Sequence, residues 1–116
     1  MDAKTPFCLS LLLFCFIPSL HAAELAGRIW YEHNKRPANN LNIGVQCPDG
    51  ARHTGKTDNY GFYRCTGIPA NKQSCYIFID DGKRHADPLL YDSGQGRDTQ
   101  NFSVLPNDNK LIIRKY

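Results

Sequence analysis

The chain has 116 residues, five cysteines and a formal net charge of +3. This length suits a single domain. The basic residues are spread along the chain, whereas a nucleic-acid binder needs clustered Lys and Arg side chains, so we expect no nucleic-acid partner.

The N-terminal segment has the pattern of a secretory signal peptide. An uncharged apolar run over residues 8–20 follows a mildly positive start and ends before the small residue Ala22. A membrane anchor is the alternative, but a spanning helix needs roughly 20 apolar residues. This run is shorter, and Pro18 interrupts it. The sequence therefore predicts a signal peptide over residues 1–22 and a periplasmic or secreted domain over residues 23–116, with no membrane span after cleavage.

The rest of the chain has the pattern of short strands separated by turn residues. We expect strands over residues 25–32, 41–47, 62–65, 74–80, 88–93, 101–105 and 110–116. In the second of these, Leu41, Ile43, Val45 and Cys47 alternate with polar or small residues, which places them on one buried face. No segment has helical apolar periodicity over three turns. The pattern predicts an all-β fold, namely one antiparallel β-sandwich of about seven strands and of Greek-key type.

Several short motifs occur in a fixed order within this pattern. They are Gly27-Arg28-Ile29, Pro37-Ala38, Ile43-Gly44-Val45, Thr57 to Tyr63, Ile68-Pro69 and Ile77-Phe78-Ile79. Together they resemble the carboxypeptidase regulatory-like, transthyretin-like β-sandwich module. Val45-Gln46-Cys47 and Ser74-Cys75-Tyr76 further resemble small exported bacterial single-domain versions of it. The resemblance implies a transthyretin-like fold. It implies no enzymatic activity, because the exported versions have none established, and it informs fold far more than function.

Three cysteines follow the predicted signal peptide, and an exported chain can use them in a disulfide. From the residues alone, a Cys47–Cys75 bridge, a Cys65–Cys75 bridge and no fixed bridge all stay open. The resemblance to the exported modules implies Cys47–Cys75, which leaves Cys65 as a free thiol. Because no Cys-x-x-Cys pair is present, we expect no metal site.

Aromatic residues give the best candidates for a binding surface. Neighbours on a strand face opposite sides, so Trp30 faces outward if Ile29 is in the core, and Phe62 faces outward if Tyr63 is in the core. With Tyr60 in the preceding turn, these residues predict an exposed aromatic patch. Such a patch marks contact with carbohydrate or protein. The alternative is packing beneath a loop or against a second sheet.

Histidines are the remaining candidates for chemistry. His33, His53 and His85 lie apart in polar segments. His85 with Asp87, or His53 near Asp58, has the composition of a base and its orienting acid, but neither has a paired nucleophile. The transthyretin-type hydroxyisourate hydrolases end in Tyr-Arg-Gly-Ser, and this chain does not. We therefore expect no catalytic residue and no cofactor.

These observations predict an exported, non-catalytic binding or structural accessory module of the bacterial cell envelope. Its expected partner is another envelope or secreted protein, bound through protein–protein contacts. A carbohydrate-binding module that uses the aromatic face is the first alternative. A small hydrolase that depends on His53 or His85 is the least favoured.

Overall fold

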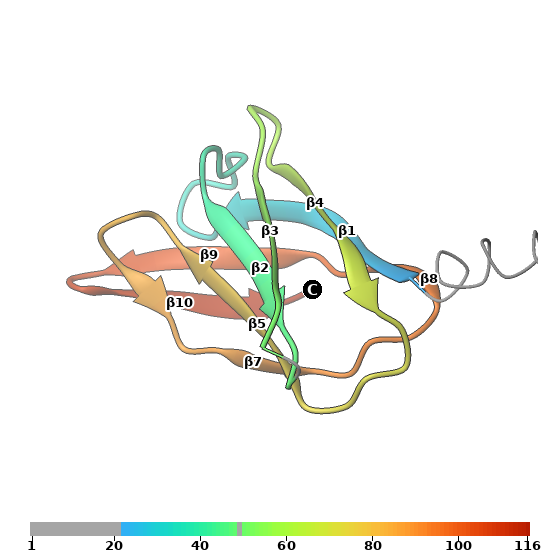
Figure 1. Ribbon diagram of the computed structural model, residues 1–116. Coiled ribbons are helices and arrows are strands. Elements are labelled where there is room, and N and C mark those ends of the chain that lie inside the picture. Colours follow the sequence, from blue (N-terminus) through green and yellow to red (C-terminus); the bar gives the residue numbers. More distant parts are fainter. Residues whose placement is uncertain (1–21, 49) are drawn as a thin grey trace, which may run out of the picture.

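The computed structural model describes residues 22–48 and 50–116, and these form an all-β domain (Figure 1). Residues 1–21 of the predicted signal peptide lie outside the described residues. The strands are β1 (Ala22–Tyr31), β2 (Asn42–Gln46), β3 (Arg52–Lys56), β4 (Phe62–Pro69), β5 (Cys75–Asp80), β6 (His85–Ala86), β7 (Leu89–Tyr91), β8 (Gly96–Thr99), β9 (Phe102–Asn107) and β10 (Lys110–Lys115). The described part of the chain contains no helix that could cross a membrane.

The all-β prediction is confirmed, but the strand number and the sheet type differ from a seven-stranded antiparallel sandwich. All seven expected strands are present. With β3, β6 and β8, which were not expected, the described residues form ten strands. The sheet is mixed, because β8 and β9 run parallel to β1 and β6 runs parallel to β10. The sequence pattern missed β3 because His53 and Gly55 fill its less exposed positions, so it has no apolar alternation. It missed β6 and β8 because the first is very short and the second is polar.

The strands follow one path through space and nearly close on themselves. Their order is β3-β2-β5-β6-β10-β9-β1-β4, with β7 added to β5 and β8 added to β1. The two ends of this path approach each other, since a Cβ on Gly55 of β3 would lie 2.5 Å from the carbonyl oxygen of Arg64 on β4. Figure 1 shows these two strands side by side. The result is a nearly closed, barrel-like sheet with its core inside.

Strand β1 is hydrogen-bonded along both edges. One edge pairs antiparallel with β4, and the other pairs parallel with β8 and then with β9. The partner changes at Gly27, where the Gln100 N–H donates to the carbonyl oxygen of Ala26 at 2.9 Å. The next amide, on Arg28, donates to the Asn101 side-chain oxygen at 2.9 Å. A side chain on Gly27 would overlap the carbonyl oxygen of Gln100, so only glycine fits here.

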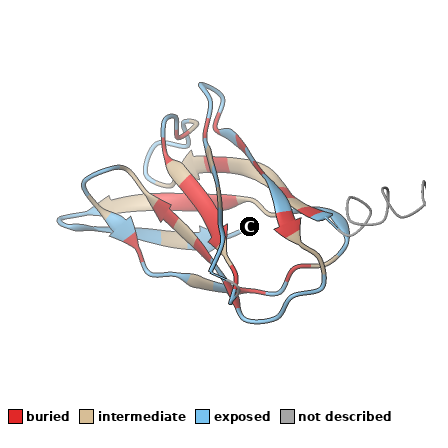
Figure 2. Ribbon diagram, in the orientation of Figure 1, coloured by how far each residue is buried: buried red, intermediate tan, exposed pale blue. Residues whose placement is uncertain are grey.

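The core is built from inward residues of all the strands except β3 and β8, which contribute no buried side chain (Figure 2). Ile43 and Val45 of β2 and Ile77 and Ile79 of β5 are buried, as the alternation predicted. Burying each such side chain contributes roughly 1.5–3 kcal/mol. Phe102 of β9 is the largest fully buried side chain among the described residues.

A disulfide joins Cys47 and Cys75 across the end of the β2–β5 ladder. Gln46 and Tyr76 form the last residue pair of that ladder. The two cysteines lie just beyond this pair, with their Cα atoms 4.1 Å apart. The bond therefore closes the open end of two core strands. This is the pair that the resemblance implied.

Cys65 is a free thiol in the core of the sheet. Its side chain is buried, and its Sγ lies 3.7 Å from the carbonyl oxygen of Ile43. Burial raises the pKa of the Cys65 thiol to about 11, because the thiolate loses its hydration. A thiol in this environment is chemically inert.

Replacing Cys47 and Cys75 together by alanine should lower the free energy of unfolding by about 3–4 kcal/mol, because the disulfide constrains the unfolded chain over a separation of 28 residues. Urea denaturation monitored by circular dichroism measures this loss. Reduction of the wild-type protein with dithiothreitol is the matched control, since it breaks the same bond without changing a side chain. A loss below about 1 kcal/mol would contradict a stabilising role.

Cys65 should make folding stability fall at alkaline pH. An unfolded thiol titrates near pH 8.5, whereas the folded one titrates at about 11. Between these values the folded state holds a proton that the unfolded state has lost, so stability declines as pH rises. The stability of the wild type relative to Cys65→Ala should therefore fall from pH 8 to pH 10, as measured by stopped-flow unfolding and refolding before the thiol can exchange with the disulfide. A difference that does not change with pH would overturn this assignment.

Candidate functional site

A tight turn after β3 displays two of the predicted surface aromatics. The Asp58 carboxylate oxygen Oδ1 accepts hydrogen bonds from the backbone N–H groups of Tyr60 and Phe62, each at 2.9 Å. Gly61 closes the turn with a φ of +82°, and a side chain there would overlap the carbonyl oxygen of Ile29. Aspartate and glycine are the residues that such a turn requires. The local sequence therefore fixes where Tyr60 and Phe62 emerge.

Arg28 on β1 brings the three predicted aromatics together. Its guanidinium carbon lies 5.1 Å from the ring centre of Trp30 and 4.9 Å from that of Phe62. Its Nε donates to the carbonyl oxygen of Tyr60 at 2.8 Å. The aromatic patch, defined as Trp30, Tyr60 and Phe62 with Arg28 among them, is thus one connected surface.

The members of this patch differ in how much surface they offer. Tyr60 is 66% exposed and Phe62 is 50% exposed. Trp30 is only partly exposed, because Arg28 lies over its ring and Tyr116 meets it edge to face with ring centres 5.1 Å apart. Arg28 also lies over the Phe62 ring, but among the described residues no second aromatic ring packs against Phe62, and it stays half exposed. Phe62 therefore offers more aromatic surface than Trp30.

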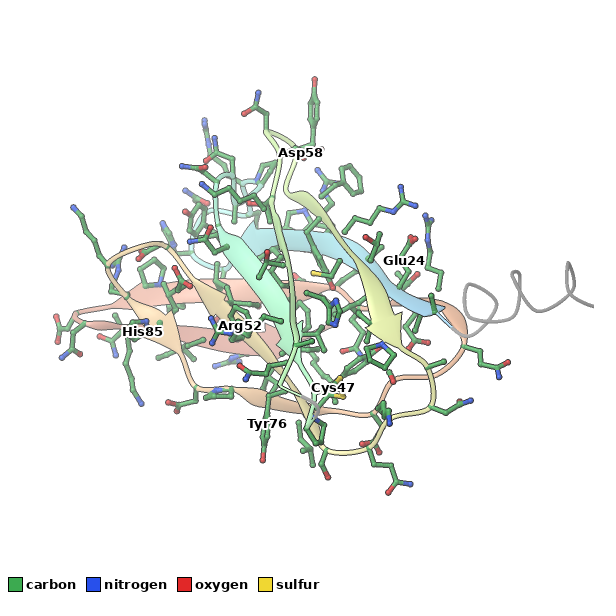
Figure 3. All side chains as sticks on the ribbon, viewed as in Figure 1. Glu24, Cys47, Arg52, Asp58, Tyr76 and His85 are labelled. Atoms are coloured by element: carbon green, nitrogen blue, oxygen red, sulfur yellow. A yellow bond between two sulfur atoms is a disulfide. The ribbon has the colours of Figure 1, made fainter. Side chains whose placement is uncertain are left out.

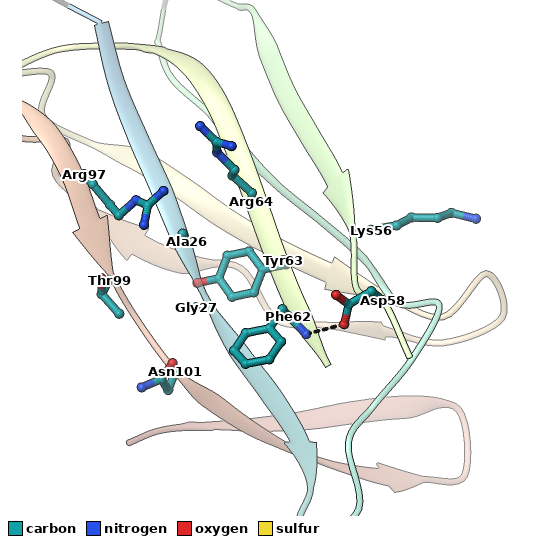
Figure 4. Close-up of a pocket in the computed structure, with 10 residues that line it drawn as sticks. All are labelled: Ala26, Gly27, Lys56, Asp58, Phe62, Tyr63, Arg64, Arg97, Thr99 and Asn101. Carbon is teal, nitrogen blue, oxygen red and sulfur yellow. Dashed lines mark hydrogen bonds between the residues drawn. The ribbon is translucent and has the colours of Figure 1, made fainter. Parts of the chain in front are cut away.

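A hollow of about 550 Å³ adjoins Phe62 on the outer face of the sheet (Figure 4). We call it the β1 hollow. Its lining residues are Ala26, Gly27, Lys56, Asp58, Phe62, Tyr63, Arg64, Arg97, Thr99 and Asn101. The small residues Ala26 and Gly27 of β1 leave the depression between β4 and β8. Its lining combines the aromatic residues Phe62 and Tyr63 with polar and cationic side chains, which can orient a polar ligand.

Two arginines of the β1 hollow share one carboxylate. Glu24 of β1 accepts from Arg64 of β4 at 2.9 Å on one oxygen and from Arg97 of β8 at 2.7 Å on the other. The hydrogen bond from Arg64 is the main reason that the pKa of Glu24 lies below its usual range. The arginine side chains are 62% and 58% exposed, and that of Glu24 is 19% exposed. Exposed ion pairs contribute only about 0–1 kcal/mol to stability, so their main consequence is to orient the two guanidinium groups.

A second hollow, of about 600 Å³, lies beside β2 and β5. Figure 3 shows its residues Arg52 and Tyr76 well away from Glu24. The Arg52 guanidinium covers the ring of Phe78 at 4.1 Å, and that ring lies so close to Gly44 that a side chain there would overlap it. The Phe78 ring is therefore covered by Arg52 on one side and by Gly44 on another, and Tyr76 is the exposed aromatic residue of this hollow. The alternation of β5, with its isoleucines inward, could have indicated that both aromatics point outward.

The histidines do not form the acid–base pairs that were weighed for a hydrolase. Asp58 bonds to its own turn, and the Asp87 carboxylate binds the Lys110 ammonium at 3.1 Å. Within residues 22–48 and 50–116, neither His53 nor His85 has an acidic partner. His33 lies beside Tyr31, with ring centres 5.7 Å apart. No group of three or more His, Cys, Asp or Glu side chains in the described ranges could hold a metal ion.

Comparisons with known proteins relate the chain to others by fold and not by sequence. No family model matches it, and no curated protein is similar to it. It is similar to the solved structure of a Bacteroides uniformis protein for which carbohydrate binding has been proposed, with a TM-score of 0.50, 17% identity, and coverage of 75% of this chain and 48% of that one.

A 9R-lipoxygenase from Cyanothece aligns with a TM-score of 0.41 and 13% identity over 68% of this chain and 16% of its own, a similarity too weak to support an argument. The chain spans about half the length of the Bacteroides protein. At 17% identity, that likeness shows a shared all-β fold.

Proposed function

We propose that this chain is an exported, non-catalytic carbohydrate-binding module that holds a saccharide in the β1 hollow against Phe62. The observation that carries this proposal is a half-exposed aromatic ring beside a depression that has polar and charged side chains around a floor of small residues. Carbohydrate binding was the first alternative drawn from the sequence. The geometry favours it over a protein contact, because a hollow of about 550 Å³ suits a small ligand.

The residues of the β1 hollow match the two kinds of surface on a sugar ring. A pyranose has an apolar C–H face that packs on an aromatic ring, and here Phe62 provides that ring. Its hydroxyl groups need both donors and acceptors, which Thr99 and Asp58 supply. Asn101 adds its amide N–H groups, since its oxygen already accepts from Arg28.

The site is held in place before any ligand arrives. The Asp58 turn fixes the backbone of Phe62, and β1 provides a floor that is hydrogen-bonded on both edges. Groups that are already ordered lose little conformational entropy when a ligand binds. This rigidity supports binding without a large rearrangement.

Three further observations support export and binding. The Cys47–Cys75 disulfide suits an oxidising compartment, and residues 1–22 have the pattern of a signal peptide. The shared fold with the Bacteroides protein agrees with a binding role, although that protein is related by fold alone. The transthyretin-like family, the bacterial envelope and a protein partner stay predictions from the sequence.

Binding should depend on Phe62. We expect ¹H–¹⁵N spectra titrated with cell-wall oligosaccharides, neutral and acidic, to show shifts at the Ala26 and Gly27 amides. Phe62→Ala should weaken the affinity about tenfold in calorimetry, because the aromatic contact is lost. Phe62→Tyr should keep most of the affinity, since it keeps a ring.

Tyr76→Ala is the matched control, because it removes an exposed aromatic from the second hollow. It should leave the affinity unchanged, and thermal melts should show that both alanine variants stay folded. If no saccharide shifts the Ala26 and Gly27 amides, the proposed function is wrong. If Tyr76→Ala weakens binding and Phe62→Ala does not, the site lies in the second hollow.

A further inference from the structure

The β1 hollow carries an excess of positive charge. Lys56, Arg64 and Arg97 line it, and Asp58 is the acid among its lining residues. With Glu24 beneath the two arginines included, three cations face two carboxylates, so the net charge is +1. A site that binds neutral sugars has no need of this excess.

Both oxygens of Glu24 and one oxygen of Asp58, Oδ1, accept hydrogen bonds within the described residues, whereas the arginines are not fully used. Asp58 accepts two backbone N–H groups of its own turn, and Glu24 gives one oxygen to each arginine. Arg64 donates through Nη2 and Arg97 through Nε. The remaining guanidinium N–H groups have no partner within the described residues, and both side chains are more than half exposed.

Glu24 orients the two arginines without consuming them. It lies on β1 between the neighbouring strands β4 and β8, so it holds one guanidinium on each side of itself. A guanidinium presents planar pairs of N–H groups that fit a carboxylate, and it keeps its charge at every physiological pH. The geometry provides a ready receptor for a second carboxylate on the solvent side.

We propose that the β1 hollow selects acidic saccharides, with the sugar ring against Phe62 and its carboxylate bound by Arg64 and Arg97. This inference rests on the proposed carbohydrate binding and names the class of ligand. Lys56 adds long-range attraction, which falls with salt because the Debye length is about 8 Å at physiological ionic strength. The class of ligand is therefore a saccharide that carries a carboxylate, and a uronic-acid oligosaccharide is a suitable probe for it.

A matched pair of ligands measures the contribution of the ligand's carboxylates to affinity. Tetragalacturonate and its methyl ester have the same sugar backbone and differ in their carboxylates. By calorimetry at low salt, the acid should bind about tenfold more tightly than the ester, which corresponds to one good charge-assisted hydrogen-bond pair. In 0.5 M NaCl this preference should largely disappear, while the Ala26 and Gly27 amides shift with both ligands.

Variants then assign the preference to named residues. Arg64→Gln and Arg97→Gln should each bring the affinity for the acid to within about threefold of that for the ester. Lys110→Gln, at the start of β10, lowers the net charge by one as each arginine variant does, and it should leave the ratio of acid to ester affinity unchanged.

The outcomes separate this inference from the function on which it rests. If acid and ester bind equally and both shift the Ala26 and Gly27 amides, carbohydrate binding stands and selection by charge is wrong. If neither ligand binds while a neutral oligosaccharide does, selection by charge is also wrong. If no saccharide binds at all, both proposals fail. A tenfold preference that Lys110→Gln removes as fully as Arg64→Gln would show only nonspecific attraction, and it would overturn the assigned site.

Discussion

Strand β1 has partners along both edges, and on one edge the partner changes from β8 to β9 at Gly27. The change brings the Gln100 carbonyl so close to β1 that no side chain fits at this position. The backbone amide of Arg28 then finds its acceptor in the Asn101 side chain. The floor of the β1 hollow lies at this crossing, so one steric constraint determines both how the sheet continues and where a ligand could lie.

The candidate site is assembled around β1 from parts that the chain supplies separately. The Asp58 turn supplies Phe62, and Arg28 ties that ring to Trp30. Glu24 forms an ion pair with one arginine of each neighbouring strand. Each part has a local physical cause, whether a turn, a cation over an aromatic ring, or an ion pair. Their combination on one face follows from β1, because its outward side chains meet all of them.

The sequence predicted those features that depend on local alternation. The inward isoleucines of β5 and the outward position of Phe62 follow from a period of two. The strands β3 and β8 were not predicted, because they consist of polar residues and glycine and lack apolar alternation. They are strands only through their backbone pairing with neighbours. The ion pairs of Arg64 and Arg97 with Glu24 were not predicted either, since the two arginines lie 40 and 73 residues from Glu24 in the sequence. Such contacts come from topology, which short motifs do not encode.

The double pairing of β1 also has a consequence for the order of folding. Its first residues contact β8 and its last contact β9, and Arg28 meets Asn101 across 73 residues of chain. Proteins whose contacts span such long separations fold slowly, because distant segments must meet before the contacts stabilise them. The sheet cannot be completed until β8 and β9 are available to pair with β1. For the exported module proposed above, the chain would still be unfolded while it crosses the membrane, and its disulfide would form on the far side.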